Sequence, residues 1–334
     1  METEEEKQLL ERWNTLQEKI AQEVKLPKSE LFDSYSIQKD ESNGEPSQNN
    51  TVLGACDENF VHTDFLMPIK EMETHFRVSL QEEGEALQST TYPGFTQQLR
   101  FDAQQQLNYL KTSALAPLTF IGGIDISFVP DTNLGVACLA VLRFPSLEVV
   151  EVHYHHCELT APYRPGYLAF RELEPVTRLF QQCEASLREK GCYPQLLFLD
   201  GCGVLHPRRA GLATHLGHTL GVATIGCAKK ILSVEHFSRE YIEGLFEGHV
   251  SSPLAMRPLV AGEAAPYRYY GYALQNTHSA KRCVFVSPGH KMGYALSLAL
   301  VSLCSRHRVP EPTRQADLRS REYIRNHFPH TAKS

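Results

Sequence analysis

The sequence predicts a mixed α/β fold in which a β-sheet is flanked by helices. From Thr119 to Leu159, three β-branched and apolar runs are separated by short turns, which is typical of neighbouring strands in a meander. After Leu159, helical and strand-like segments alternate, which favours helices packed on the faces of the same sheet. No internal repeat interrupts this order. We therefore expect a single mixed α/β domain.

Each predicted element rests on a local hydrophobic pattern. The N-terminal helix has apolar residues at three- and four-residue steps, and Pro27 ends it. The run before Asp200 is continuously apolar, as in a strand buried on both faces. The predicted strands are Thr119–Val129, Gly135–Phe144, Leu147–Leu159, Gln195–Asp200, Ala223–Ala228, Tyr269–Thr277 and Arg282–Val286. The predicted helices are Glu4–Val24, Gln97–Leu110, Leu168–Leu187, Pro207–Leu220 and Met292–Arg306.

Composition divides the chain into four parts. These are an N-terminal helix (1–26), an acidic insertion of low order (27–95), the α/β domain (96–323) and a C-terminal tail (324–334). The insertion is polar and aperiodic, so it buries too little apolar surface to offset the entropy of ordering it. Its sequence is compatible with some local order near Phe65–Met72. Residues 1–95 carry 20 acidic and 8 basic side chains, whereas residues 96–334 carry 19 and 25. The larger part is mildly basic, which favours a polyanion such as nucleic acid as partner.

Composition also excludes several classes of protein. The chain has 334 residues, of which 42% are hydrophobic and 22% charged, as in ordinary globular proteins. Its most apolar stretch, Met292–Cys304, is shorter than the roughly 20 residues of a membrane span, so no membrane partner is expected. The acidic N-terminus is unlike a secretory or transit peptide, and the nine cysteines include no CxxC pair. We expect reduced thiols in a cytoplasmic or nuclear protein, the nucleolus included.

Three carboxylates occupy positions where acidic residues are uncommon. Asp125 lies within a predicted strand, on the face of Ser127 and opposite Ile124; the alternative is that this face meets solvent. Glu172 falls on the apolar stripe of its helix, and the alternative is a solvated glutamate near a helix start. Asp200 ends a buried strand, where open α/β sheets bind ligands. If they converge, the three would hold one or two divalent metals, which is the arrangement of a nuclease.

Basic side chains stand at several element ends. Lys229 follows a predicted strand. His290 follows a glycine turn in a basic neighbourhood, where an ordinary exposed histidine is the alternative. Arg208 and Arg209 lie in the first turn of a predicted helix, where they oppose the helix dipole unless a phosphate binds there.

An aromatic turn adds a candidate for contact with a base. Pro162–Gly166 is rigid and presents Tyr163 at the surface. Stacking of an aromatic ring on a base contributes roughly 1–3 kcal/mol, although an ordinary surface tyrosine is the alternative. His153, His155 and Cys157 share one strand face, but no second ligand pair has the spacing of a zinc site. Zinc is therefore not expected.

Six ordered sequence blocks resemble the endonuclease V family, the deoxyinosine 3′ endonucleases. The blocks are Gly122–Phe128, Ala161–Glu172, Leu199–Gly211, Thr224–Lys230, Val286–His290 and Pro310–Asp317. The resemblance implies a ribonuclease H-like mixed sheet flanked by helices. It also implies Mg²⁺-dependent hydrolysis of a phosphodiester one nucleotide 3′ to inosine, with Mn²⁺ as a substitute. The acidic insertion has no counterpart in the compact family pattern, so the resemblance says nothing of its role.

The resemblance assigns roles to individual residues. It implies that Asp125, Asp200 and Glu172 are catalytic and hold the metal, and that His290 and Lys229 support catalysis near the scissile phosphate. The turn with Tyr163 at its tip matches the wedge that fills the gap left by a displaced base. The residues expected to bind nucleic acid are Pro162, Tyr163, Arg164, Pro165, Arg208 and Arg209, with Gly166, Leu168, Gly201, His206 and Gly211 at positions around the hypoxanthine pocket.

The implied partner is single-stranded RNA or DNA that contains inosine, and the resemblance leaves the choice between them open. Animal-type members of the family favour RNA. We expect a monomeric enzyme. Two other hypotheses are an inosine-RNA-binding protein with vestigial cleavage and an interaction protein that acts through its acidic arm. The presence of all three carboxylates favours the enzyme, because a pure binder has no need of such a cluster.

Overall fold

The computed structural model describes residues 3–26, 63–80, 93–110, 115–162, 164–246, 254–262, 268–276 and 282–328. Its helices are α1 (Glu4–Glu23), α3 (Ile69–Phe76), α4 (Pro93–Leu110), α5 (Leu168–Glu189), α6 (Leu212–Leu220), α7 (Arg239–Gly244), α8 (Tyr294–Leu303) and α9 (Glu311–His327). Its strands are β1 (Phe120–Phe128), β2 (Leu134–Arg143), β3 (Glu148–Glu158), β4 (Leu196–Leu199), β5 (Ala223–Ala228), β6 (Ala255–Ala261), β7 (Arg268–Gln275) and β8 (Val284–His290).

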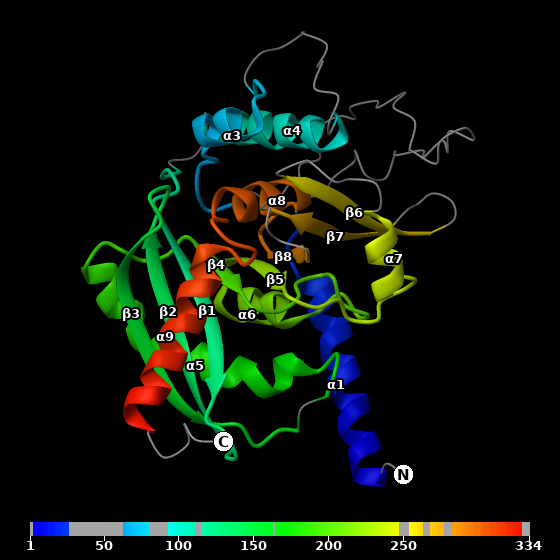
Figure 1. The fold of residues 1–334 in the computed structure, drawn as a ribbon, viewed down its shortest axis with the longest axis vertical. Helices are drawn as coiled ribbons and strands as arrows, with labels where there is room; N and C mark the ends of the chain where they lie inside the picture. Colours follow the sequence, from blue (N-terminus) through cyan, green and yellow to red (C-terminus); the bar gives the residue numbers. More distant parts are fainter. Residues whose placement is uncertain are drawn as a thin grey trace.

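The described strands form one eight-stranded sheet in the order β3-β2-β1-β4-β5-β8-β7-β6. β4 pairs in parallel with β1 and with β5, whereas the outer pairs are antiparallel. In Figure 1, α9 crosses β1 and β2, α3 and α4 lie over α8, and α1 lies beside α6. The prediction of a mixed sheet flanked by helices is confirmed. In the part of the chain that the structure describes, no helix has the length and apolar character needed to cross a membrane.

The two faces of β1 meet different helices. Ile124 and Ile126 are buried in a cluster shared with α5. On the opposite face, the hydroxyl groups of Ser127 and Ser320 of α9 are hydrogen-bonded at 2.7 Å. Because strand side chains alternate, Asp125 shares the face that α9 covers. This face of β1 therefore lies under a helix, and the alternative of a solvent-facing strand is excluded.

The start of α6 differs from the prediction. The helix begins at Leu212, later than predicted, because the backbone of Gly211 packs against Cys202. A Cβ atom at Gly211 would lie 2.3 Å from the carbonyl oxygen of Cys202. The residues before it form a loop in which Arg209 has a φ of 54°. Arg208 and Arg209 are thus not in the first turn of a helix, and the argument from the helix dipole was wrong.

Part of the predicted low-order insertion belongs to the hydrophobic core. Phe65 and Met72 are fully buried in a cluster with side chains of the sheet and of α8. Gln106 of α4 holds this segment, since its side-chain amide donates to Thr63 Oγ1 at 2.5 Å and to the carbonyl oxygen of Phe65 at 3.1 Å. The rest of the predicted insertion, apart from the first residues of α4, lies outside the described residues.

Four elements were not predicted at all: α3, α7, β6 and α9. α9 is the one that matters for the site, because it packs across β1 and β2. It runs to His327 and buries Ile324 against Val129 and Val136, although the sequence placed Ile324 in the C-terminal tail.

Candidate active site

The predicted carboxylates lie near the point where the parallel pairing of β1 with β4 ends. Asp200 directly follows β4, and its backbone N–H donates to the carbonyl oxygen of Ile124 at 3.4 Å. This bond places Asp200 level with Asp125 on the neighbouring strand. Glu172 comes from the first turns of α5 and is only 8% exposed. Acidic side chains thus come from β1, from α5 and from the residue that follows β4, in the centre of the sheet.

Burial and mutual repulsion perturb these carboxyl groups. Burial raises the pKa of Asp125 well above its usual range, and the charges of Asp200, Asp317 and Glu172 raise it further. Burial, followed by the charge of Asp200, raises the pKa of Glu172 to about 8. Repulsion of this kind acts only between carboxylates that lie close together. Asp125, Glu172 and Asp200 therefore lie within electrostatic reach of one another, and we call this group the acidic cluster.

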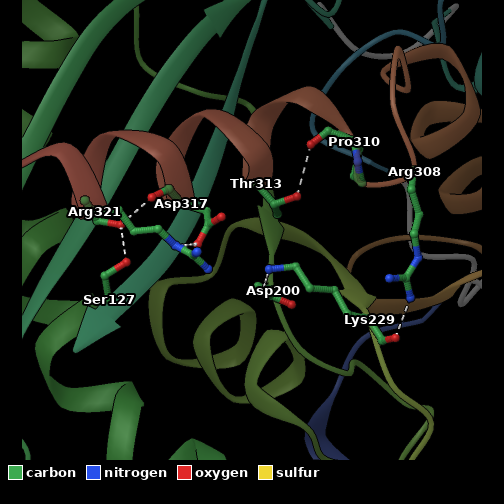
Figure 2. Close-up of polar contacts among 9 residues, drawn as sticks. Ser127, Asp200, Lys229, Arg308, Pro310, Thr313, Asp317 and Arg321 are labelled. Carbon is green, nitrogen blue, oxygen red and sulfur yellow. Dashed lines mark hydrogen bonds and ion pairs between the residues drawn. The ribbon is translucent and has the colours of Figure 1, made fainter. Parts of the chain in front are cut away.

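Lys229 supplies a positive charge to this cluster. Its Nζ lies 2.5 Å from Oδ2 of Asp200, as Figure 2 shows. Burial acts to lower the pKa of Lys229, but the attraction of Asp200, Asp125 and Asp317 outweighs it and the pKa is raised. Arg308 holds the backbone at this point, because its guanidinium donates to the carbonyl oxygen of Lys229 at 2.6 Å. Lys229 is thus a permanently charged ammonium in a fixed position.

Asp317 is a member of the cluster that sequence reasoning missed. It lies on α9, where its Oδ1 accepts a hydrogen bond from Nε of Arg321 at 2.8 Å (Figure 2). Its charge contributes to the raised pKa of Asp125. Pro310–Asp317 is one of the six blocks of the resemblance, but Asp317 was given no role. Without a prediction of α9, nothing in the sequence connected this residue to β1.

The structure does not bring His290 to the acidic cluster. In the pairing of β5 with β8, His290 stands opposite Thr224 near the start of β5, whereas Lys229 follows the end of that strand. The His290 ring is 4% exposed, and its Nδ1 accepts the backbone N–H of Lys25 at 3.3 Å. Burial lowers the pKa of His290 to about 4. His290 therefore holds the chain just after α1, near the end of β5 opposite to Lys229.

Two loops that the sequence assigns to base recognition contact each other directly. Nε2 of His206 lies 2.8 Å from the carbonyl oxygen of Gly166, and its Nδ1 accepts the backbone N–H of Arg208 at 3.2 Å. This pair of bonds requires a neutral imidazole that carries its proton on Nε2. Burial favours the same form, since it lowers the pKa of His206 to about 4. The side chain of Arg208 also donates to Gly166, at 3.2 Å.

The two other arginines predicted to bind nucleic acid have partners within the protein. Arg164 is paired with Glu6 of α1 at 2.9 Å. Arg209 donates to the carbonyl oxygen of Tyr269 at 2.8 Å and to the hydroxyl of Tyr294 at 2.6 Å. Arg209 thus ties its loop to β7 and α8.

The remaining residues predicted to bind nucleic acid lie on or beside the same two loops. Pro162 and Pro165 are exposed, and Leu168 is half-buried where α5 begins. Gly201 follows Asp200, and Gly211 precedes α6, with its N–H donating to the carbonyl oxygen of Gly203 at 3.0 Å. Tyr163 lies outside the described residues.

Comparison with known proteins decides the family. A family model described as Endonuclease V matches residues 102–318, which include every member of the acidic cluster. The chain belongs to the endonuclease V family. Membership identifies it as an endonuclease. Endonuclease V of Homo sapiens is 41% identical over 220 residues, which cover 64% of this chain and 74% of the human protein. Endonuclease V of Mus musculus is 38% identical over 211 residues, which cover 61% of this chain and 60% of the mouse protein.

Solved structures of endonuclease V share the fold. The crystal structure of the catalytic domain of human endonuclease V is 40% identical, with a TM-score of 0.58, and the match covers 64% of this chain and 85% of that one. A second match is endonuclease V of Ciona intestinalis in complex with a 24mer DNA that contains an inosine followed by a ribo-adenosine. It is 27% identical, with a TM-score of 0.59, and covers 69% and 98% of the two chains. The ribonuclease H-like fold is confirmed.

Proposed function

We propose that this endonuclease hydrolyses a phosphodiester one nucleotide 3′ to inosine in RNA or DNA and that it needs a divalent metal. The observation that carries the proposal is the acidic cluster of Asp125, Glu172, Asp200 and Asp317, beside the end of β4. Support for inosine as substrate comes from the Ciona intestinalis relative, which was crystallised with inosine-containing DNA. The place of action would be the cytoplasm or nucleus.

The residues of the cluster fit a hard cation. All the donors are carboxylate oxygens, which Mg²⁺ and Mn²⁺ prefer. The repulsion that raises the pKa of Asp125 and Glu172 is relieved when a cation lies between them. Among the described residues, no three His, Cys, Asp or Glu side chains form a preassembled metal site. We therefore expect Asp125, Asp200 and Glu172 to draw together as the metal binds. When bound, the cation would activate water and stabilise the leaving oxygen.

Lys229 has a separate part in this proposal. Its ammonium group would bind an oxygen of the scissile phosphate, because it is charged at every physiological pH and lies at the cluster. Arg308 would keep it there through the backbone contact. The exchange of the Asp200 ion pair for a phosphate contact would also free Asp200 for the metal.

Base recognition would take place at the two joined loops. The loop before α5 holds Gly166, and the loop before α6 holds His206 and Gly211; the two are hydrogen-bonded to each other. The first loop leads into the helix that carries Glu172, and the second directly follows Asp200. A base turned out of its strand must be read on its Watson–Crick edge, for which closely approaching backbone is suited. Tyr163 would fill the space that the base leaves.

A labelled single strand with one inosine tests the proposal. The purified chain is incubated with the RNA and DNA versions, each in Mg²⁺ and in EDTA, beside strands that carry guanosine at the same position. We expect one cut, one nucleotide 3′ to inosine, only in Mg²⁺. Cleavage of the guanosine strand at an equal rate would refute inosine recognition. Tight binding to the inosine strand with no cut in Mg²⁺ or Mn²⁺ would support the binding protein with vestigial cleavage.

A further inference from the structure

Gln17 of α1 is a polar side chain buried between the two recognition loops. It is 0% exposed. Its Nε2 donates to the carbonyl oxygens of Gly166 and Ala210, each at 3.1 Å. Its Oε1 accepts a hydrogen bond from Nε of Arg208 at 2.5 Å. One amide group therefore joins the loop that precedes α5 to the loop that precedes α6.

Other side chains in the first half of α1 contact the same loop and the start of α5, while its C-terminal end pairs with α6 through Glu23 and His218. Trp13 stacks on Phe170, with ring centroids 4.7 Å apart and planes at 6°. The hydroxyl of Tyr167 donates to Asn14 at 2.7 Å. Glu6 adds the ion pair with the loop's arginine. From Glu6 to Gln17, α1 thus lies on the loop that the proposed function assigns to the base and on the helix that follows it.

These bonds fix the backbone rather than fill space. The carbonyl oxygen of Gly166 receives donors from Gln17, His206 and Arg208, which is more than its two lone pairs accommodate at full strength. The guanidinium of Arg208 also lies 4.5 Å above the ring of Tyr167. A site that reads a base by backbone contacts depends on the position of such groups to within about 0.5 Å.

We infer that Gln17 is a positioning residue for base recognition, which holds the Gly166 loop and the Arg208 loop in register from a helix outside the matched residues 102–318. The inference rests on the proposed function. α1 is then a part of the substrate site and not only a support of the fold. The chemistry of the acidic cluster does not depend on Gln17, because none of the bonds of this side chain reaches a carboxylate of the cluster.

Two substitutions separate the bonds of Gln17. Gln17→Met keeps the length of the side chain and removes all three bonds. Gln17→Glu keeps the acceptor for Arg208 but loses both donors, so α1 stays docked while the carbonyl oxygens of Gly166 and Ala210 are released. Gln8→Met is the matched control, because Gln8 is exposed on the same helix.

The experiment measures kcat and KM on the single inosine strand in Mg²⁺ and the ratio of kcat/KM for inosine over guanosine. The affinity of each protein for the inosine strand is measured in EDTA. In both Gln17 variants we expect KM to rise by about tenfold or more and the ratio to fall, because two or three hydrogen bonds are lost. We expect kcat to stay within about threefold of the starting protein. Gln8→Met should match the starting protein in every measurement.

Two results would overturn the inference. In the first, Gln17→Glu has the same KM and the same ratio of kcat/KM for inosine over guanosine as Gln8→Met. Gln17→Glu alone decides the inference if Gln17→Met is insoluble. The other is a loss of kcat at constant KM, which would assign Gln17 to the chemical step or to folding. If the unsubstituted chain binds the inosine strand in EDTA but does not cut it, the proposed catalysis fails, and the affinities of the variants then decide the inference. If the unsubstituted chain neither binds nor cuts the inosine strand, the proposed function and the inference about Gln17 both fail.

Discussion

Gly123 of β1 and Pro312 of α9 touch backbone to backbone. A Cβ atom on Gly123 would lie 1.8 Å from the carbonyl oxygen of Pro312 and 2.7 Å from the backbone nitrogen of Thr313, far inside van der Waals contact. The missing side chain lets the first turn of α9 lie directly on β1. Later turns of the helix then bring Asp317 to the face of β1 that carries Asp125. A contact between two backbones thus determines how close these two carboxylates lie.

Gly123→Ala should separate α9 from β1. The added methyl group meets backbone atoms that cannot rotate away, so we expect a loss of stability of about 1–3 kcal/mol and a large fall in cleavage rate as Asp317 moves from Asp125. Urea unfolding and single-turnover cleavage measure the two effects. Gly244→Ala is the control, because a Cβ at Gly244 meets nothing within 4 Å. A Gly123→Ala protein as stable and active as this control would contradict the close approach.

Asp125→Asn and Asp200→Asn should each abolish cleavage in Mg²⁺ and in Mn²⁺. Both remove a carboxylate from the proposed metal ligands, and an amide oxygen binds such a cation weakly. Asp125→Asn should leave the metal-free protein at least as stable, because the native carboxyl group must either bear the repulsion of its neighbours or take up a proton. Asp131→Asn, in an exposed turn, is the control. Near-normal cleavage by either variant would remove that residue from the metal site.

Lys229→Met should lower kcat by about a hundredfold or more, since a fixed positive charge at the reacting phosphate is lost. The neighbouring Lys230 is exposed, and Lys230→Met should behave like the starting protein. Arg308→Ala should give a smaller loss, because it releases the backbone carbonyl groups of Lys229 and Cys283 but keeps the ammonium group of Lys229. Single-turnover rates in saturating Mg²⁺ make the comparison. Equal losses from Lys229→Met and Lys230→Met would mean that only the general charge of this loop matters.

The predictable parts of the site are those with a local pattern. The alternation of β1 predicted that Asp125 and Ile124 face opposite sides, and the apolar run of β4 predicted Asp200 at a strand end; the structure has both. α9 was missed because most of its 17 residues are polar or charged and carry no apolar stripe of the usual width. The position of α9 depends on its close approach to Gly123. A single glycine in a strand does not predict which helix will pack against it.

The N-terminal parts were misjudged for a related reason. Residues 63–80 were grouped with a polar segment, because a few apolar side chains in an acidic context do not reveal that they share a core with α8. The buried contacts of Gln17 were also beyond prediction. A glutamine within an amphipathic helix looks the same in sequence whether it meets solvent or two backbone carbonyls.

Phe65→Ala and Met72→Ala should each destabilise the protein although both residues lie in the predicted insertion. Both side chains are fully buried, and truncation of such residues costs about 2–5 kcal/mol. Urea unfolding followed by circular dichroism gives the loss. Lys70→Ala, an exposed neighbour on α3, is the control. A loss below about 0.5 kcal/mol in both variants would mean that this segment is not part of the core.

His206 should make the junction of the two loops sensitive to acid. Burial, helped by the charge of Arg208, lowers the pKa of His206 to about 4 from an ordinary 6.5. Between these two values the unfolded chain binds a proton that the folded protein does not. Stability therefore falls as the pH falls from about 6.5 to about 4, and the loss from this one residue is on the order of 3 kcal/mol. Protonation would also oppose the bond in which Nδ1 accepts the N–H of Arg208.

His206→Gln should make this dependence shallower, because the amide does not titrate and still offers a donor to Gly166. Urea midpoints at pH 7 and pH 5, in EDTA, give the slope for each protein. The variant should keep part of the slope, since burial also lowers the pKa of His215 and of His290 to about 4 and both residues remain in it. His236→Gln changes an exposed histidine and should leave the slope unaltered. If His206→Gln has the same slope as His236→Gln, then His206 is not held neutral against Gly166, and the two loops are joined by Gln17 and Arg208 alone.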